Sequence, residues 1–342
     1  MRAFKNFLLL LPATAMLSGC NTLVLNAPGD VAAQQGRLII VATLLMLLII
    51  VPVIVLTLWF GWRYRASNQT ANYQPDWDHS TALELVIWAA PLMIIIALGA
   101  VAWISTHTLD PYRPLRRIDA DRAVAPGTPP LVIEAVALDW KWLFIYPELG
   151  IATVNEVAAP VDTPILFKIT GTTVMNSFFI PALAGQIYAM PSMETRLNAV
   201  MNAQGDYVGF SANYSGAGFS DMRFKFRALA SDAFEQWVAH ARSGNPTLDR
   251  EAFAALDKPS VREPVHRYAR VAPDLFRRIL NRCVDDSRMC QDRMMAIDTG
   301  GAGSAAAYQV AQLDRRRYVE ALACTAANPN GLPPPRPEST PR

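Results

Sequence analysis

The sequence predicts an α+β membrane protein, in which a two-helix transmembrane hairpin is followed by a β-sandwich domain and a helical C-terminal extension. Three observations predict this order. Two long uncharged stretches lie within the first third of the 342 residues, short β-rich segments between turn residues follow them, and helical apolar spacing begins after residue 230. The chain is 52 % hydrophobic with a mean hydropathy of +0.17, and this excess is concentrated in the uncharged stretches.

The first 20 residues have the pattern of a bacterial lipoprotein signal. Arg2 and Lys5 precede an apolar core at residues 7–11 that is too short to cross a bilayer. The segment ends in Leu-Ser-Gly-Cys, which resembles the lipobox at which a signal is cut and the cysteine is diacylated. We therefore predict a signal peptide at residues 1–19 and a lipid-modified N-terminus at Cys20. An ordinary secretory signal with a chance cysteine is the alternative.

The two uncharged stretches are long enough to span a membrane. Residues 38–62 contain no charged side chain over 25 residues, and residues 85–106 are also uncharged, with tryptophans near their ends. We predict transmembrane helices at residues 37–63 and 83–107, joined by a loop at residues 64–82. A buried helix of a soluble protein is the alternative for each, and the lengths disfavour it.

The lipobox decides the predicted topology. If Cys20 is lipidated on the outer face of the inner membrane, residues 20–36 lie in the periplasm, the loop at residues 64–82 is cytoplasmic, and the chain after Asp110 is periplasmic again. Two arginines directly after the first span agree with the positive-inside rule, while four arginines between residues 113 and 122 oppose it. Long translocated domains largely escape that rule, so we expect a large periplasmic domain.

Residues 128–230 have the pattern of a β-sandwich domain. Short apolar runs alternate with Gly, Pro, Asn or Asp at the spacing of a sandwich or barrel. The predicted strands are residues 131–138, 140–146, 165–170, 186–188, 194–200, 205–211 and 222–228.

The remainder of the chain divides into a helical region and a tail. Apolar residues recur at helical spacing around Trp237 and again around Phe276, which predicts a helical region at residues 231–298. A Gly/Ala-rich segment and a Pro-rich end follow, and neither can bury enough apolar surface to become ordered. We therefore predict a disordered tail at residues 299–342.

Four strings in the β-rich region have an unusual composition. They are DWKWLFIYPE at residues 139–148, IATVNE at 151–156, VMNSFFIP at 174–181 and QIYAM at 186–190. They resemble segments of subunit II of cytochrome bo-type ubiquinol oxidases, in the haem–copper oxidase superfamily. The resemblance extends from the lipobox to about Arg227, with a weaker match at residues 272–276. It implies that the domain at residues 128–230 is cupredoxin-like.

The resemblance also locates a copper site that has lost its ligands. In the related cytochrome c oxidase subunit, an upstream His and the pattern Cys-x3-Cys-x3-His-x2-Met hold a dinuclear copper centre, whose thiolates bridge both ions. The matching positions here are Asn176, Ser211, Asn213, Ser215, Phe219 and Met222. Serines replace both cysteines, Asn176 and Phe219 replace the histidines, and only Met222 is retained. Because a neutral hydroxyl cannot replace a bridging thiolate, we predict a vestigial site that binds no metal.

An emptied copper site implies a different electron donor. The copper centre of the relatives accepts electrons from soluble cytochrome c, so the resemblance implies that membrane-dissolved ubiquinol is oxidised instead, in the large haem-bearing subunit. It implies that haems and copper belong to subunit I, that small membrane subunits III and IV and membrane lipid are further partners, and that this chain binds no cofactor and contains no catalytic residue. The chain is then expected to support assembly and stability of a proton-pumping oxidase. A loop that never held copper predicts the same lack of metal.

Glu84 directly precedes the second apolar stretch and has two compatible interpretations. Thr81 and Glu84 fit a capping box, in which Thr81 is the N-cap and Glu84 is the third helical residue. The resemblance implies a second role, because a glutamate at this place in the family lies near the cytoplasmic mouth of a proton-uptake channel in the large subunit. A carboxylate at the inner membrane surface can collect protons.

Trp140, Trp142, Phe144 and Tyr146 alternate along one predicted strand. In copper-bearing relatives the matching segment lies near the path of electron input. We expect instead that these aromatic side chains pack the domain against the membrane subunits.

Three cysteines lie in the C-terminal part, which faces an oxidising compartment in the predicted topology. Cys283 and Cys290 are close in the sequence and are the expected disulfide pair, which leaves Cys324 over. A soft copper(I) site that uses the nearby methionines is the alternative for this segment.

Other function classes have less support. A net charge of +2 without a basic aromatic patch does not indicate nucleic-acid binding, and no catalytic triad or phosphate-loop signature is present in the sequence. Two alternatives stay open. One is a cytochrome c oxidase subunit with copper held on its Cys/Met tail, and the other is a free-standing lipoprotein that binds a periplasmic ligand or assists metallation. Copper content and co-purification with a haem protein discriminate among them.

Overall fold

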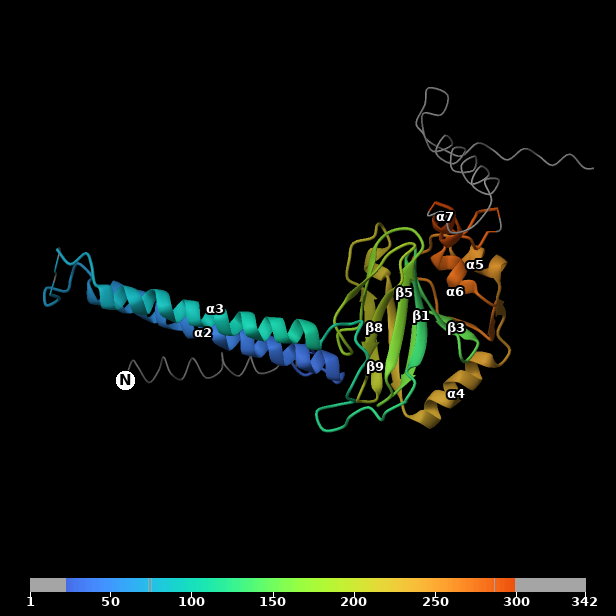
Figure 1. Ribbon diagram of the computed structural model, residues 1–342, viewed down its shortest axis with the longest axis horizontal. Coiled ribbons are helices and arrows are strands. Elements are labelled where there is room, and N and C mark those ends of the chain that lie inside the picture. The colour runs from blue at the N-terminus through green and yellow to red at the C-terminus, as the bar shows by residue number, and fades with distance from the viewer. Residues whose placement is uncertain (1–22, 73, 75, 286, 299–342) are drawn as a thin grey trace, which may run out of the picture.

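The computed structural model describes residues 23–72, 74, 76–285 and 287–298, and Figure 1 shows a helical hairpin that extends from one side of a β-rich domain. The predicted signal peptide, Cys20 and the tail at residues 299–342, which includes Cys324, lie outside the described residues. Within the described part, the hairpin is followed by the β-domain and then by a region of short helices. This is the predicted fold class.

The hairpin consists of α2 (Asp30–Arg63) and α3 (Thr81–Thr108), which lie side by side. The most hydrophobic 18-residue windows have mean hydropathies of 3.3 and 2.5, and only 0 % and 6 % of these windows are buried. Apolar side chains therefore cover the helices on all sides. By length and composition both helices can cross a membrane, where lipid surrounds such surfaces.

The first turn of α2 is packed on the β-domain. Asp30 and Val31 are buried there, although they precede the predicted span. Gly29 allows the close approach, because a Cβ atom at this position would lie 2.5 Å from the carbonyl oxygen of Leu183. The Gly29 N–H also donates to the carbonyl of Ala182 at 2.9 Å. The hairpin and the domain are thus joined by backbone contacts as well as by the chain.

The β-domain is a sandwich of two mixed sheets. One has six strands in the order β12-β3-β2-β1-β5-β8, and the other has five in the order β4-β10-β9-β6-β7. The pairs β1–β5 and β4–β10 are parallel and the remaining pairs of these two sheets are antiparallel. The strands are β1 (Leu131–Leu138), β2 (Lys141–Tyr146), β3 (Ile151–Val154), β4 (Glu156–Pro160), β5 (Ile165–Gly171), β6 (Asn176–Phe179), β7 (Ile187–Ala189), β8 (Thr195–Ala199), β9 (Gly205–Ser211) and β10 (Arg223–Leu229).

The alternating aromatic residues of β2 form the centre of the sandwich. Trp142, Phe144 and Tyr146 are fully buried. The rings of Trp142 and Phe144 contact those of Phe178 and Phe224, and the ring of Tyr146 contacts that of a tryptophan on α4 (Ser231–Arg242). The expectation that this aromatic row packs the domain against membrane subunits is therefore wrong for these three residues. Alternate side chains of a strand in a sandwich face the opposite sheet, and these rings fill the space between the sheets.

The C-terminal region covers the outer face of the six-stranded sheet. Leu143 and Ile145 of β2 point to this face and pack in a second apolar cluster with Phe253, Leu275 and other residues of the region. Its middle part is not helical as expected, because β12 adds an antiparallel strand to the exposed edge of β3. The elements are α4 (Ser231–Arg242), β11 (Thr247–Leu248), α5 (Arg250–Leu256), β12 (His266–Tyr268), β13 (Arg270–Val271), α6 (Leu275–Leu280) and α7 (Gln291–Asp298).

Candidate functional site

The six positions predicted as the emptied copper site lie near one end of the five-stranded sheet. Asn176 begins β6, Ser211 ends β9 and Met222 directly precedes β10. Since β9 pairs with both β6 and β10, these strand ends are neighbours although they are far apart in the sequence. The loop between β9 and β10 carries the other three positions, including Ser215.

Hydrogen bonds among these side chains satisfy the polar groups. The Ser211 hydroxyl donates to Asn176 Oδ1 at 3.0 Å and accepts from the Ser177 N–H at 3.4 Å. The Ser215 hydroxyl lies 3.9 Å from the Met222 sulfur. Asn176, Ser211 and Met222 are buried. A buried hydroxyl that has protein partners on both sides needs no metal to satisfy it.

Asn213 and Phe219 shape the loop rather than line a ligand set. The Asn213 amide donates to the carbonyls of Met175 and Tyr214, each at 3.3 Å. Phe219 begins the short helix η1 (Phe219–Asp221), and its ring packs against Tyr214 with centroids 5.6 Å apart. An aromatic contact therefore stands where the family pattern has an imidazole.

The donor atoms at these positions do not fit a dinuclear copper centre. They comprise two serine hydroxyls, two amides and one thioether, with no thiolate and no imidazole. Soft thiolates are needed to bridge copper ions, and neutral hydroxyls do not supply that bonding. In the described residues, no group of three or more His, Cys, Asp and Glu side chains is arranged to hold a metal ion.

The indole of Trp140 packs against the loop between β9 and β10. Its indole Nε1 donates to the Ser215 carbonyl at 2.8 Å. Gly218 lies on the ring, since a Cβ atom there would come within 2.5 Å of the indole, and Gly216 has a φ of +114° that favours glycine. The sequence drew attention to Trp140 but not to the two glycines, whose role depends on this contact between distant segments.

A buried lysine beside Trp140 was missed by the sequence analysis. Lys141 is 2 % exposed, and its ammonium donates to the Lys258 carbonyl at 2.8 Å and to the Ser260 hydroxyl. Glu263 lies 3.9 Å from the same ammonium. Burial lowers the pKa of Lys141, and the Glu263 carboxylate opposes that change. The partners come from residues 258–263, so the C-terminal region is fastened to the turn that carries Trp140.

Glu84 lies in the first turn of α3 but does not complete a capping box. Ser80 is the N-cap and makes no side-chain cap bond, so Thr81 is the first helical residue and Glu84 is the fourth. In a capping box, the carboxylate of the third helical residue accepts a hydrogen bond from the N-cap N–H. Here the third helical residue is Leu83, which has no carboxylate. The predicted box is therefore wrong. Glu84 Oε1 instead lies 2.7 Å from His79 Nδ1.

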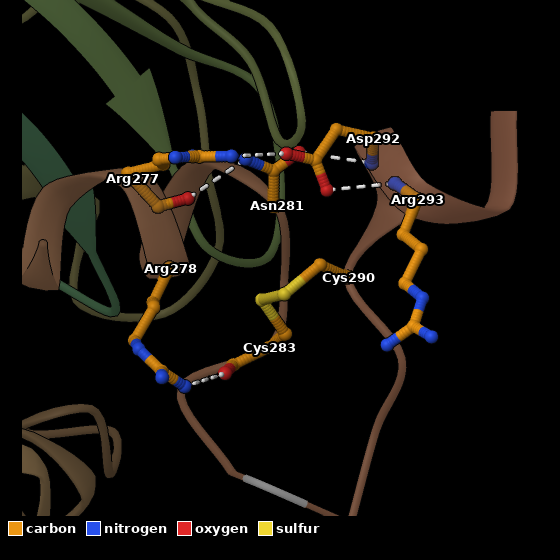
Figure 2. The surroundings of a disulfide bond; sticks show 7 residues. All are labelled: Arg277, Arg278, Asn281, Cys283, Cys290, Asp292 and Arg293. Carbon is orange, nitrogen blue, oxygen red and sulfur yellow. Dashed lines mark hydrogen bonds and ion pairs between the residues drawn. A yellow bond between two sulfur atoms is a disulfide. The ribbon is translucent and has the colours of Figure 1, made fainter. Parts of the chain in front are cut away.

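Cys283 and Cys290 are joined by a disulfide between the end of α6 and the start of α7, as Figure 2 shows. Asp292 fastens the same junction, because its N–H donates to Asn281 Oδ1 at 3.1 Å and its carboxylate accepts from Arg277 at 3.1 Å. With both sulfur atoms bonded to one another, this segment offers no thiolate to a metal.

Comparisons with known proteins give matches over most of the chain. Residues 148–229 match the family "Cytochrome C oxidase subunit II, periplasmic domain", and residues 242–287 match "COX Aromatic Rich Motif". Cytochrome bo(3) ubiquinol oxidase subunit 2 of Pseudomonas putida is 50 % identical over 267 residues, which is 78 % of this chain and 82 % of the relative. Ubiquinol oxidase subunit 2 of Acetobacter aceti is 46 % identical over 270 residues, which is 79 % of this chain and 85 % of that relative.

The chain belongs to the ubiquinol oxidase subunit 2 family. As a ubiquinol oxidase subunit 2, it is a membrane protein with two candidate spans and a cupredoxin-like periplasmic domain, and the resemblance inferred from the four strings is confirmed. Among solved structures, the periplasmic domain of subunit II of cytochrome oxidase (CoxB) of Bradyrhizobium japonicum is 24 % identical with a TM-score of 0.32, covering 33 % of this chain and 95 % of that one. The aromatic-rich motif corresponds to the region from the end of α4 to the disulfide.

Proposed function

We propose that this chain is the copper-free, non-catalytic subunit 2 of a proton-pumping respiratory ubiquinol oxidase. The complex oxidises ubiquinol to quinone and reduces O2 to water, and its haems and copper belong to subunit I. The partners are the large subunit I, the small membrane subunits III and IV, and membrane lipid. Soluble cytochrome c and nucleic acid are not partners.

The hydrogen bonds at the emptied copper positions carry the proposal. The Ser211 hydroxyl donates to Asn176 Oδ1, and the Ser215 hydroxyl lies 3.9 Å from the thioether sulfur of Met222. A dinuclear centre needs bridging thiolates at these places. Since this chain offers soluble cytochrome c no electron acceptor at that site, lipid-soluble quinol is the donor that reaches the haem-bearing subunit directly. The contribution of the chain is then assembly and stability of the complex.

The placement in the inner membrane belongs to the same proposal. Lipidation of Cys20 holds the N-terminus outside, and α2 and α3 return the chain to the periplasm. The proposed parts are a signal peptide (1–19), a lipidated periplasmic segment (20–36), the first span (37–63), a cytoplasmic loop (64–82), the second span (83–107), the periplasmic cupredoxin-like domain (128–230), the helical region (231–298) and a C-terminal tail (299–342).

Glu84 is the proposed site on this chain for proton uptake by the complex. It lies at the cytoplasmic end of α3 in this topology, and its side chain and that of His79 are 52 % and 63 % exposed. A carboxylate and an imidazole in contact at the inner surface can accept protons from water and pass them on. Subunit I would receive them.

Purification in mild detergent tests the proposed function. The full chain should be recovered with a many-span haem protein, and the preparation should oxidise ubiquinol but not reduced cytochrome c. Recovery of the chain alone would overturn the assignment as a subunit. Copper analysis of the separated chain is the second measurement, and stoichiometric copper would overturn the copper-free assignment even if the complex is intact.

A further inference from the structure

A cavity of about 230 Å³ lies where the outer ends of both helices meet the β-domain. The start of α2, the end of α3 and the segment that follows α3 form most of its lining, together with Leu197 of β8 and the Gly185–Gln186 turn. Gly29, directly before α2, donates to the Ala182 carbonyl at 2.9 Å and so fixes the start of the helix on the domain. The cavity thus belongs to the junction between hairpin and domain, away from the emptied copper positions.

The depth of this cavity corresponds to the lipid headgroup layer. Trp103 is 71 % exposed near the end of α3, as expected of a tryptophan at the outer interface, and Arg37 is the last charge before the uncharged stretch of α2. A helix rises about 1.5 Å per residue, so Asp30 and Leu109 lie roughly 10 Å beyond these two markers. With a hydrocarbon core of about 30 Å in a bilayer of about 40–45 Å, the headgroup region is roughly 5–8 Å deep on each side, so the cavity lies at its outer edge.

The guanidinium groups of Arg113 and Arg116 at the cavity have N–H donors that are not used within the described part of the chain. Arg117 is committed to Asp30, to which it donates two bonds at 2.8 and 2.7 Å. Arg113 donates one bond, to the His107 carbonyl at 3.1 Å. Within the described part of the chain, the Arg116 carbonyl accepts from the Val124 N–H at 3.0 Å, while its guanidinium has no hydrogen-bond or ion-pair partner. Asp110 is the other carboxylate of the lining, so the cavity keeps a net positive charge.

The rest of the lining combines apolar and amide groups. Val31, Leu109, Leu115 and Leu197 supply apolar walls, while the amides of Gln34, Gln35 and Gln186 add polar groups. A free phosphate ion would gain nothing from the apolar walls. A phospholipid matches both kinds of surface, because its phosphate suits the guanidinium fork and its glycerol and upper acyl groups suit the leucines.

We propose that this cavity binds the headgroup of an anionic phospholipid of the outer leaflet, with its phosphate held by Arg113 and Arg116. The proposal deepens the proposed function, since it rests on the hairpin crossing the membrane with the domain in the periplasm. It also gives a reason for the arginines after the second span, which oppose the positive-inside rule: they neutralise lipid phosphate at the outer surface. The bound lipid would fill the angle between hairpin and domain.

Native mass spectrometry of the purified complex tests this proposal. After delipidation, phosphatidylglycerol is added to the parent complex and to the variant Arg113→Gln/Arg116→Gln. Each charge-assisted pair contributes enough that the double variant should retain this lipid roughly 10-fold or more weakly. The matched control is Arg288→Gln, an exposed arginine between α6 and α7 at the other end of the domain, which should retain lipid like the parent. Arg113→Lys/Arg116→Lys, which keeps the charges, should recover part of the binding.

Additional measurements distinguish an anionic phospholipid from a zwitterionic lipid, a free phosphate ion and another subunit as the ligand of this cavity. Phosphatidylcholine should be retained more weakly than phosphatidylglycerol, and millimolar inorganic phosphate should not displace the lipid. Equal retention by parent and double variant, or displacement by inorganic phosphate, would overturn the lipid site. A photo-crosslinker at residue 116 that captures another subunit instead of lipid would also overturn it. Co-purification and ubiquinol oxidation are measured on the same preparation, so a failure of the proposed function is seen separately.

Discussion

Single side chains at the β9–β10 loop decide whether this domain can hold copper. Ser211 and Asn176 are 3.0 Å apart, in neighbouring strands, and Met222 lies beside them with its sulfur buried. The backbone that places these residues together does not depend on a metal, because sheet pairing positions it. The backbone thus brings these positions together, but the side chains lack the thiolates and imidazoles that would bind copper.

Restoring the donors should restore copper binding. The variant Asn176→His/Ser211→Cys/Ser215→Cys/Phe219→His keeps Met222 and should bind copper as a dinuclear centre, because two thiolates can then bridge the ions. Copper per chain and the visible absorption spectrum are the measurements. The same variant without Ser215→Cys lacks one bridging thiolate and should bind far less. If the fourfold variant folds but takes up no more copper than the parent, the assignment of these positions is wrong.

Glu134 gives the domain a pH-dependent stability. It lies on β1 beside Lys168 of β5 and lines a cavity under α6. Burial raises the pKa of Glu134 from 4.5 to about 7, the Lys168 ammonium opposes this, and Glu194 adds to it. The folded protein therefore holds the proton more tightly than the unfolded chain does. The stabilisation from this group is complete below about pH 4.5 and is lost as the pH rises through about 7.

Glu134→Gln should remove this pH dependence. The midpoint of thermal unfolding of the detergent-solubilised full chain is measured between pH 5 and pH 8. The parent should lose stability across this range more steeply than the variant, which should be the more stable of the two at pH 8. Glu235→Gln, at an exposed position on α4, is the control and should follow the parent. Parallel curves for parent and Glu134→Gln would contradict the assigned shift.

At the scale of elements, the C-terminal region is fastened to the sandwich at several separate points. The Glu156 carboxylate on β4 accepts from the Trp237 indole on α4 at 2.9 Å and from Arg267 on β12 at 2.7 Å. Asn155 accepts from the Trp142 N–H and donates to the Glu263 carbonyl. These bonds hold the C-terminal region on the outer face and at the edge of the six-stranded sheet. The face and the edge strand β3 are therefore shielded from other chains.

The disulfide fastens the last described element, α7, to α6. It closes a loop with a sequence separation of 7, for which loop-closure entropy predicts a stabilisation of about 2–3 kcal/mol. Cys283→Ser/Cys290→Ser should increase hydrogen exchange and protease cleavage between residues 281 and 298, because the covalent link between α6 and α7 is then lost. Ubiquinol oxidation should not change. Dithiothreitol should produce the same increase in the parent and none in the variant; equal protection in all samples would show that the disulfide does not order the segment.

At the scale of the whole molecule, the hairpin is held in a defined orientation on the domain. Asp30, 3 % exposed at its side chain, receives both bonds from Arg117, and Asn198 donates to the carbonyl of Pro111 at 3.0 Å. In the proposed topology the other end of the hairpin is cytoplasmic, and two continuous helices connect it to this junction. The first turn of α3, which contains Glu84, lies at that end, away from the β-domain in Figure 1.

Glu84→Gln tests proton uptake in the intact oxidase. The substitution keeps the size of the side chain but removes its exchangeable charge, so the number of protons pumped per electron and the steady-state rate of O2 reduction should both fall. Stopped-flow proton uptake and oxygen consumption in vesicles are the measurements. The control is Glu148→Gln in the periplasmic domain, which should leave both values at the parent level. Unchanged pumping in Glu84→Gln would reject the uptake role.

The sequence by itself determined the order of the parts, both spans and most strands, because these follow from local hydrophobic patterning. It missed β3, β4 and β6, which have only four or five residues each and are set by pairing with distant strands. It predicted the copper positions through a family resemblance, and that prediction stays untested, but it could not show that Ser211 and Asn176 bond to one another. Only the tertiary structure decided that the aromatic row faces the core, that Lys141 is buried under residues 258–263 and that Glu84 pairs with His79. The first two results depend on which distant segments meet in space, and the third depends on the local geometry at the start of α3; apolar periodicity carries no information about either.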